Sequence, residues 1–178
     1  MDASLLAGWD NFYVIIGSAA AGLTGLTFVV IALSHDAGPV RPDGIRAFVT
    51  PTIVHFGGVL ALAAYVSMPH QHVATLSAGF LVGGAVGVAY GLHTARNLRK
   101  VDYVPVREDW VWNVIVPTLA YATLLGLGIL VWYRAEAALF GVGGLAVMML
   151  FVGIRNAWDI AVWMSLSKEQ REQERGKT

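Results

Sequence analysis

Hydrophobic residues gather in five long continuous runs along the chain, and short polar segments separate the runs. A helix needs about 20 apolar residues to cross a hydrocarbon core roughly 30 Å thick. Each run has about this length and few ionisable residues, whereas a helix of a soluble core would keep charge on one face. The pattern therefore predicts five membrane-spanning helices: Phe12–Leu33, Ala47–Ser67, Val73–Leu92, Val111–Tyr133 and Ala135–Ile154.

The predicted fold class is an all-α, polytopic transmembrane helical bundle. Of the 178 residues, 56% are hydrophobic and 13% are charged, and the mean hydropathy of +0.61 is higher than that of a soluble domain. A membrane β-barrel would show short alternating segments instead. Residues 1–164 are expected to form the transmembrane domain and residues 165–178 a polar cytoplasmic tail. Because no Lys or Arg precedes the first run, we expect it to be retained and not cleaved as a signal peptide.

The basic residues predict the orientation, because cytoplasmic segments of membrane proteins are enriched in Lys and Arg. With five spans, Arg134 is the one basic residue on its side of the membrane, and the other eleven of the twelve lie opposite. These eleven are Arg41, Arg46, Arg96, Arg99, Lys100, Arg107, Arg155, Lys168, Arg171, Arg175 and Lys177. The distribution predicts an external N-terminus and a cytoplasmic C-terminus.

Small residues recur every four positions in two of the predicted spans. The third span carries Gly79, Gly83, Gly87 and Gly91, and the first carries Gly17, Ala21 and Gly25. Such ladders let another helix approach closely. They favour either tight packing within one protomer or self-association of protomers, and the two alternatives are compatible.

Two pairs of spans resemble each other, which suggests one helix followed by two repeated helical hairpins. Pro51, Thr52 and Ile53 match Pro117, Thr118 and Leu119, and the segment 91–95 matches the segment 153–157. Repeats of two spans would be related by an axis along the membrane normal. Pro51 and Pro117 are expected to kink their helices at matching places.

His55 is the ionisable side chain predicted to lie deepest in the membrane. It follows Arg46 by nine residues, or about 13 Å of helix, which places it near the midplane. Ionisable groups at this depth face the bundle interior and have a partner or a function. Its counterpart in the repeat is Tyr121. The residue is predicted either to relay protons or contact a solute, or to be a neutral His bonded by a neighbouring helix.

A second polar cluster is expected near the cytoplasmic ends of the third and fifth spans. His93 would lie opposite Arg155, Asn156 and Asp159, and Arg155 and Asp159 are four residues apart on one helical face. The cluster is interpreted either as ordinary interfacial snorkelling or as a cytoplasmic vestibule that selects an ion or small solute.

Enzyme activity, metals and cofactors are not predicted. The sequence has no catalytic or phosphate-binding motif, no acidic residue deep in a span and no cysteine. His55 and His93 differ in predicted depth by roughly 9 Å, a poor arrangement for two haem ligands. His70 and His72 alone do not complete a metal site. A net charge of zero gives no indication of a nucleic-acid partner.

Two segments carry a resemblance to known sequences. Residues 11–13 with 17–26 (NFY, GSAAAGLTGL) and residues 151–159 (FVGIRNAWD) resemble a group of small uncharacterised bacterial multi-spanning membrane proteins. In that group His commonly stands where this chain has Arg155. The resemblance implies a bacterial inner-membrane location, and no established activity accompanies it.

The functional expectation is a homo-oligomeric channel or transport-like pore for an ion or small solute. The alternative is a non-conducting accessory subunit that binds another membrane protein through the same glycine faces. The expected partners are the lipid bilayer and either further copies of the chain or another membrane protein.

The predicted topology can be checked with reporter fusions after Leu33, Ser67, Lys100, Tyr133 and Thr178. We expect cytoplasmic reporter activity after Leu33, Lys100 and Thr178 only, because those sites lie on the side rich in basic residues. Any other alternation contradicts the five-span topology.

Overall fold

The structure, a computed structural model, describes residues 5–35, 49–99 and 107–175. Over these ranges all regular secondary structure is helical, which confirms the all-α class. The elements are α1 (Asp10–His35), α3 (Thr50–Val66), α4 (Val73–Leu98), α5 (Arg107–Trp110), the π-helix η2 (Val111–Ile115), α6 (Val116–Leu130) and α7 (Ala135–Arg175).

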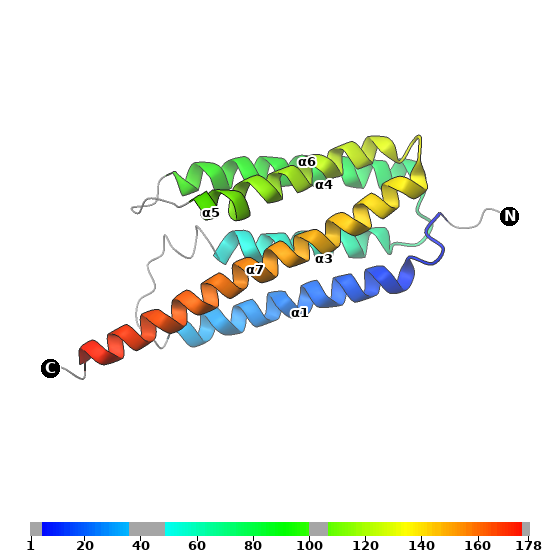
Figure 1. The fold of residues 1–178 in the computed structure, drawn as a ribbon. Coiled ribbons are helices and arrows are strands. Elements are labelled where there is room, and N and C mark those ends of the chain that lie inside the picture. The colour runs from blue at the N-terminus through cyan, green and yellow to red at the C-terminus, as the bar shows by residue number, and fades with distance from the viewer. Residues whose placement is uncertain (1–4, 36–48, 100–106, 176–178) are drawn as a thin grey trace.

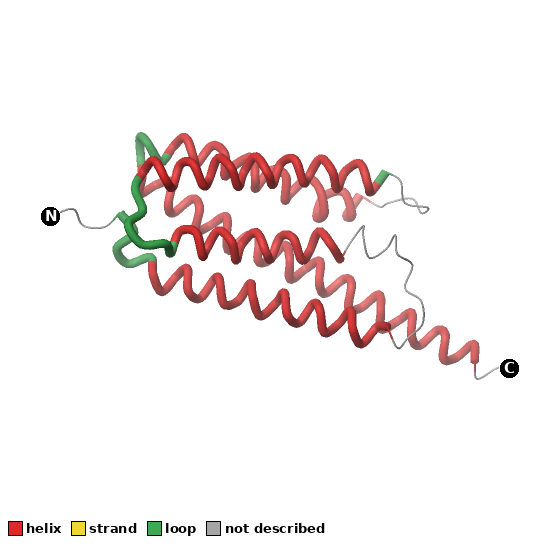
Figure 2. Tube along the Cα trace, turned by 180° about the vertical axis from the view of Figure 1, so that it is seen from behind, coloured by secondary structure: helices red, strands yellow, loops and turns green. Residues whose placement is uncertain are grey.

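The helices lie side by side in an elongated bundle (Figure 1). We call the N-terminal end the one where α1 begins and the turns 67–72 and 131–134 lie, and the C-terminal end the opposite one (Figure 2). α4 packs on α6 and α3 packs on α7, while α1 lies along α3 and α7. α3, α4, α6 and α7 thus form a four-helix arrangement, and α1 flanks it.

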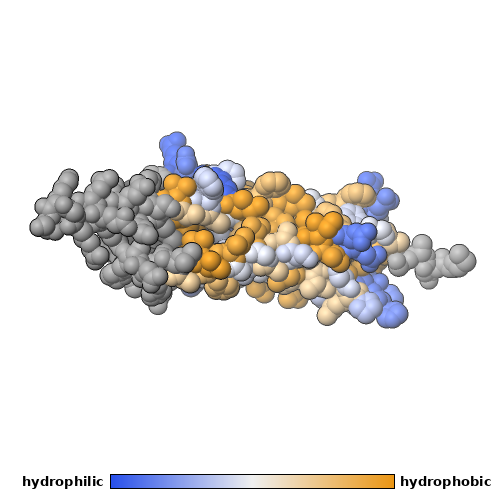
Figure 3. All heavy atoms as spheres, turned by 90° about the horizontal axis from the view of Figure 1, so that it is seen from below, coloured by the Kyte–Doolittle hydropathy of each residue, from blue (hydrophilic) through white to orange (hydrophobic). Residues whose placement is uncertain are grey.

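Among the residues that the structure describes, four helical segments are long and apolar enough to cross a membrane: Asp10–Ala32, Val73–Leu98, Arg107–Leu130 and Ala135–Val162. α3 is also apolar but has only 17 residues, the lower limit for a span. Ala47, where the second span was predicted to begin, lies outside the described residues. The structure therefore supports four of the five spans by length, and the second remains a prediction. On the face drawn in Figure 3, hydrophobic residues cover the middle of the molecule.

Several predicted boundaries differ from the observed helix ends. α4 continues beyond Leu92 to Leu98, and α7 continues beyond Ile154 to Arg175, through most of the tail predicted from residue 165. Helices end at caps and breakers, and neither Gly nor Pro occurs between Ile154 and Arg175. Hydropathy shows where a span leaves the apolar layer, whereas the helix itself can continue into the polar region. The predicted C-terminal ends of these two helices therefore came too early in the sequence.

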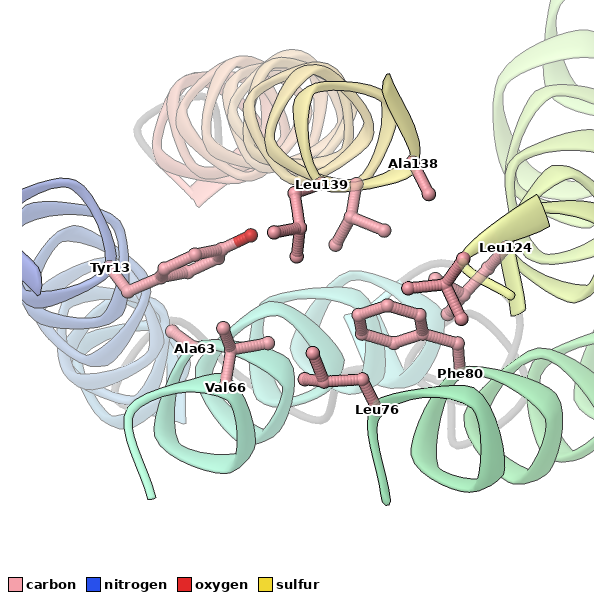
Figure 4. Close-up of a cluster of buried hydrophobic side chains, with 10 residues drawn as sticks. Tyr13, Ala63, Val66, Leu76, Phe80, Leu124, Ala138 and Leu139 are labelled. Carbon is pink, nitrogen blue, oxygen red and sulfur yellow. The ribbon is translucent and has the colours of Figure 1, made fainter. Parts of the chain in front are cut away.

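A hydrophobic cluster fills the N-terminal half of the bundle. Its side chains come from α1, α3, α4, α6 and α7 and point toward one another (Figure 4). Phe80, Leu76 and Leu139 in this cluster are at most 1% exposed. A second apolar cluster around Phe56, Val59 and Met149 continues the core along α1, α3 and α7. The N-terminal half is therefore closed by packed apolar side chains.

The glycines of α4 allow α6 to approach closely. A Cβ atom on Gly84 would lie 2.9 Å from both the Leu125 nitrogen and the Tyr121 oxygen of the α6 backbone. Gly87 contacts the ring of Tyr121, and Gly91 contacts Thr118. Close backbone packing of this kind is how small residues stabilise helix pairs in membranes.

The predicted ladder does not face a single neighbour, because steps of four residues drift by about 40° per step around an α-helix. Gly79 faces Tyr65 at the α3 side, while Gly91 faces α6. Gly83 is exposed, and the contact with α6 follows Gly84, Gly87 and Gly91 instead.

The ladder of α1 divides in a similar way. Gly17 is buried, with the Ala63 side chain of α3 3.2 Å from the position of an added Cβ. Ala21 and Gly25 are exposed, and an added Cβ on Gly25 meets no atom of the described residues within 4 Å. Of the three ladder positions, only Gly17 is buried within the described part of the chain.

We expect Gly84→Ala to destabilise the bundle, because the added methyl group meets backbone atoms that cannot rotate away. Overpacking of this kind costs about 1–3 kcal/mol. Thermal unfolding in detergent measures the loss. Gly144→Ala is the matched control, because that glycine is exposed and no described atom lies within 4 Å of its added Cβ. Equal stability of the two variants would contradict the close approach of α4 and α6.

Candidate functional site

Buried polar side chains gather in the C-terminal half of the four-helix arrangement. They come from α3, α4 and α6; Thr52, His55 and Thr94 are buried, and the others are half-buried. We call them the polar cluster: Thr52, His55, Tyr90, Thr94, Thr118 and Tyr121. Thr52 and His55 are 0% and 1% exposed. The cluster contains no Asp, Glu, Lys or Arg, so its chemistry is that of uncharged hydrogen-bonding groups.

A hydrogen bond between His55 and Tyr121 joins two helices across the middle of the arrangement. His55 Nδ1 lies 3.1 Å from the Tyr121 hydroxyl, and the two rings are 5.9 Å apart. The Tyr90 ring from α4 stands edge-on to His55 at 6.3 Å. The sequence predicted an interior position for His55, and the structure buries it among aromatic side chains of two other helices.

The two bonded residues are also the matching positions of the expected hairpin repeat. They are 66 residues apart, the same separation as Pro51 from Pro117 and Thr52 from Thr118. In a two-fold repeat of the hairpins, α3 is equivalent to α6 and α4 is equivalent to α7. The contact of α3 with α7 then corresponds to the contact of α6 with α4, and both contacts are present. Equivalent residues of such a repeat meet where its axis passes between the hairpins.

Two atoms of the polar cluster are buried without a hydrogen-bond partner among the described residues: His55 Nε2 and Thr118 Oγ1. A buried polar group without a partner costs about 1–3 kcal/mol. In either tautomer, one His nitrogen bonds Tyr121 and the other keeps a vacant donor or acceptor position. His55 Nε2 and Thr118 Oγ1 can therefore form hydrogen bonds with a small polar molecule.

Both prolines are the second residue of an α-helical segment and follow a π-helical residue. Pro117 stands two residues after Ile115, the end of η2, and Pro51 stands two residues after the π-helical Val49. Proline lacks an N–H and crowds the carbonyl of the preceding turn, and a π-turn accommodates both. The prolines thus determine where the α-helical hydrogen bonding of α3 and α6 begins, and these helices carry His55 and Tyr121.

The charged residues at the C-terminal end form a separate group on α7 and α5. Arg155 pairs with Asp159 at 3.1 Å and with Glu108 at 3.6 Å, and its guanidinium lies 4.5 Å from the centre of the Trp112 ring. The predicted pair within α7 is present. Asn156 donates a hydrogen bond to the Trp112 carbonyl at 3.4 Å.

The expected meeting of His93 with these α7 residues does not occur. His93 bonds Asn97 of its own helix at 2.9 Å, and its ring lies 6.4 Å from Tyr90. The reason is the topology of the bundle, in which α4 packs on α6 and the contacts of Arg155 go to α5 and η2.

Sequence reasoning missed Tyr90, Thr118 and Trp112 as parts of these groups. Tyr90 lies one turn before His93 on the same helix, and Thr118 directly follows the repeated proline, so both had a signal in the sequence. The sequence indicated only that Trp112 is an interfacial aromatic residue. Its contact with Asn156 is made by its backbone carbonyl, which every residue has, so the residue type gave no signal.

Within the described residues, no three His, Asp or Glu side chains come together in a way that could hold a metal ion. Comparison with profiles of known protein families, with curated proteins and with solved structures finds no match.

We expect Tyr121→Phe to lower the stability of the protein in detergent by about 0.6–2 kcal/mol, the range for one interhelical hydrogen bond in a membrane protein. His55→Leu should cost at least as much, because it removes the same bond and changes the packing. Tyr133→Phe is the control, since Tyr133 is 80% exposed. Unchanged unfolding of both interior variants would show that the bond contributes nothing.

Proposed function

We propose that this protein is a transport-like membrane protein that moves an ion or small solute. The observation that supports the proposal most is the His55–Tyr121 pair at the centre of the bundle, with a His nitrogen that has no partner among the described residues. Membrane proteins keep such groups where a solute or proton passes, because burial without a partner is costly.

The distribution of polar groups suggests a site reached from one side. The polar cluster lies in the C-terminal half, the predicted cytoplasmic side, and the apolar cluster of Figure 4 fills the other half. Tyr90 lies between His55 and the exposed His93, so aromatic and imidazole groups extend from the centre toward that end. We expect passage to require a rearrangement of the N-terminal half.

The composition of the cluster favours one class of solute. No charged side chain in the cluster would balance a permanent ion, whereas an imidazole can bind and release a proton, and hydroxyl groups can bind a small polar molecule. A proton or a small neutral hydrogen-bonding solute is therefore the class we propose. The bacterial inner membrane, implied by the resemblance, is its proposed location.

The rival proposal is a non-conducting accessory subunit, and α1 is the feature that favours it. Gly22 and Gly25 are exposed on this flanking helix, and no described atom lies within 4 Å of an added Cβ on either. Such a face accepts a helix of another membrane protein or of a second copy. Homo-oligomerisation through α1 is compatible with both proposals.

Flux measurements in liposomes distinguish the two proposals. We expect purified protein to carry protons or a small polar solute in a pH-dependent manner, and His55→Leu to abolish this flux while the protein stays folded. His70→Asn is the control, because His70 is exposed in the turn 67–72 and Asn tolerates its positive φ of 59°. Wild-type protein that conducts none of these species from pH 5 to 8 would favour the accessory role.

A further inference from the structure

The backbone of the segment that leads into α6 lacks one hydrogen bond. In η2 the Val116 N–H donates to the Val111 carbonyl, one residue further back than in an α-helix. The next residue, Pro117, has no N–H. The Trp112 carbonyl therefore has no donor from its own helix.

We infer that Asn156 is a positioning residue that supplies this missing donor and so holds the π-turn in place. Its side-chain Nδ2 lies 3.4 Å from the Trp112 carbonyl oxygen, and the residue is 4% exposed. A carbonyl left without a donor in an apolar layer would be costly, so an amide buried at this point has a clear physical purpose.

The neighbouring residue strengthens the same contact. Arg155 stacks on the Trp112 ring and pairs with Glu108, one turn before Trp112. Two consecutive residues of α7 thus hold the side chain and the carbonyl of one residue of η2. In the sequence they lie at the centre of the segment 151–159, one of the two segments that carry the resemblance and one to which it assigns no role.

The contact determines how the first turns of α6 are placed. Thr118 and Tyr121 follow Pro117 by one and four residues, and they contact Gly91 and His55. If the π-turn relaxed to an α-turn, the segment before it would rotate by about 100° relative to α6. Asn156 therefore couples α7 to the polar cluster. Any consequence for transport rests on the proposed function, whereas the hydrogen bond from Asn156 to the Trp112 carbonyl does not depend on it.

A double-mutant cycle between Asn156 and Pro117 tests the inference. Asn156→Leu should lower the Tm in detergent by about 2–4 °C, the shift expected for one lost hydrogen bond in a chain of this size. Pro117→Ala restores an N–H at position 117, so the α6 segment can satisfy its own carbonyls. In the Pro117→Ala background, Asn156→Leu should therefore cause little or no further loss.

Asn97→Leu is the matched control, because Asn97 bonds a side chain of its own helix at the same end of the bundle. Its effect should be the same with either residue at position 117. Should Pro117→Ala not fold, Pro117→Ser provides a second background with an N–H. An equal loss from Asn156→Leu in both backgrounds, or no loss in either, overturns the inference. The cycle measures thermal stability and not flux, so its result does not depend on the outcome of the transport experiment.

Discussion

The rest of this structure depends on the need of every polar group to find a partner within the protein, because an apolar membrane layer offers no water. Helices satisfy most of the backbone, and one exception lies where proline interrupts the pattern. At Pro117 the chain forms a π-turn and a side-chain amide from α7 bonds the remaining carbonyl. At the centre of the bundle, Nδ1 of His55 bonds the Tyr121 hydroxyl, while Nε2 of His55 has no partner among the described residues.

Close helix packing makes these polar contacts possible. Gly84, Gly87 and Gly91 bring α4 against α6, so Tyr121 is held between α4 and the ring of His55. Larger residues at these positions would separate the helices and move the hydroxyl away from the imidazole. The glycine face and the polar cluster are thus one structural unit, and the apolar cluster of the N-terminal half supports it.

Much of this arrangement could be predicted from the sequence, because hydropathy and spacing are local signals. The apolar runs predicted the helices, and the prolines and the offset of 66 residues predicted that His55 and Tyr121 are equivalent. The direct bond between them was not predicted, because it depends on how the two hairpins pack.

The remaining differences also have physical causes. The ladder of four glycines was predicted as one face, although an α-helix turns by 100° per residue and such a ladder winds around it. Asn156 was predicted only as part of a polar cluster, interpreted as interfacial snorkelling or as a cytoplasmic vestibule, because the sequence alone does not show which backbone carbonyl lacks a donor. A π-turn has no simple signature in a single sequence, so the carbonyl that Asn156 bonds could not be predicted.

The central claim is that one interior hydrogen bond joins the two hairpins. Solid-state NMR of the ¹⁵N-labelled histidine rings in lipid bilayers tests it most directly. Tyr121→Phe should move the Nδ1 resonance of His55 and leave the spectra of the other histidines unchanged, while Tyr133→Phe should move none. A His55 spectrum that is identical in wild type and Tyr121→Phe would contradict the account.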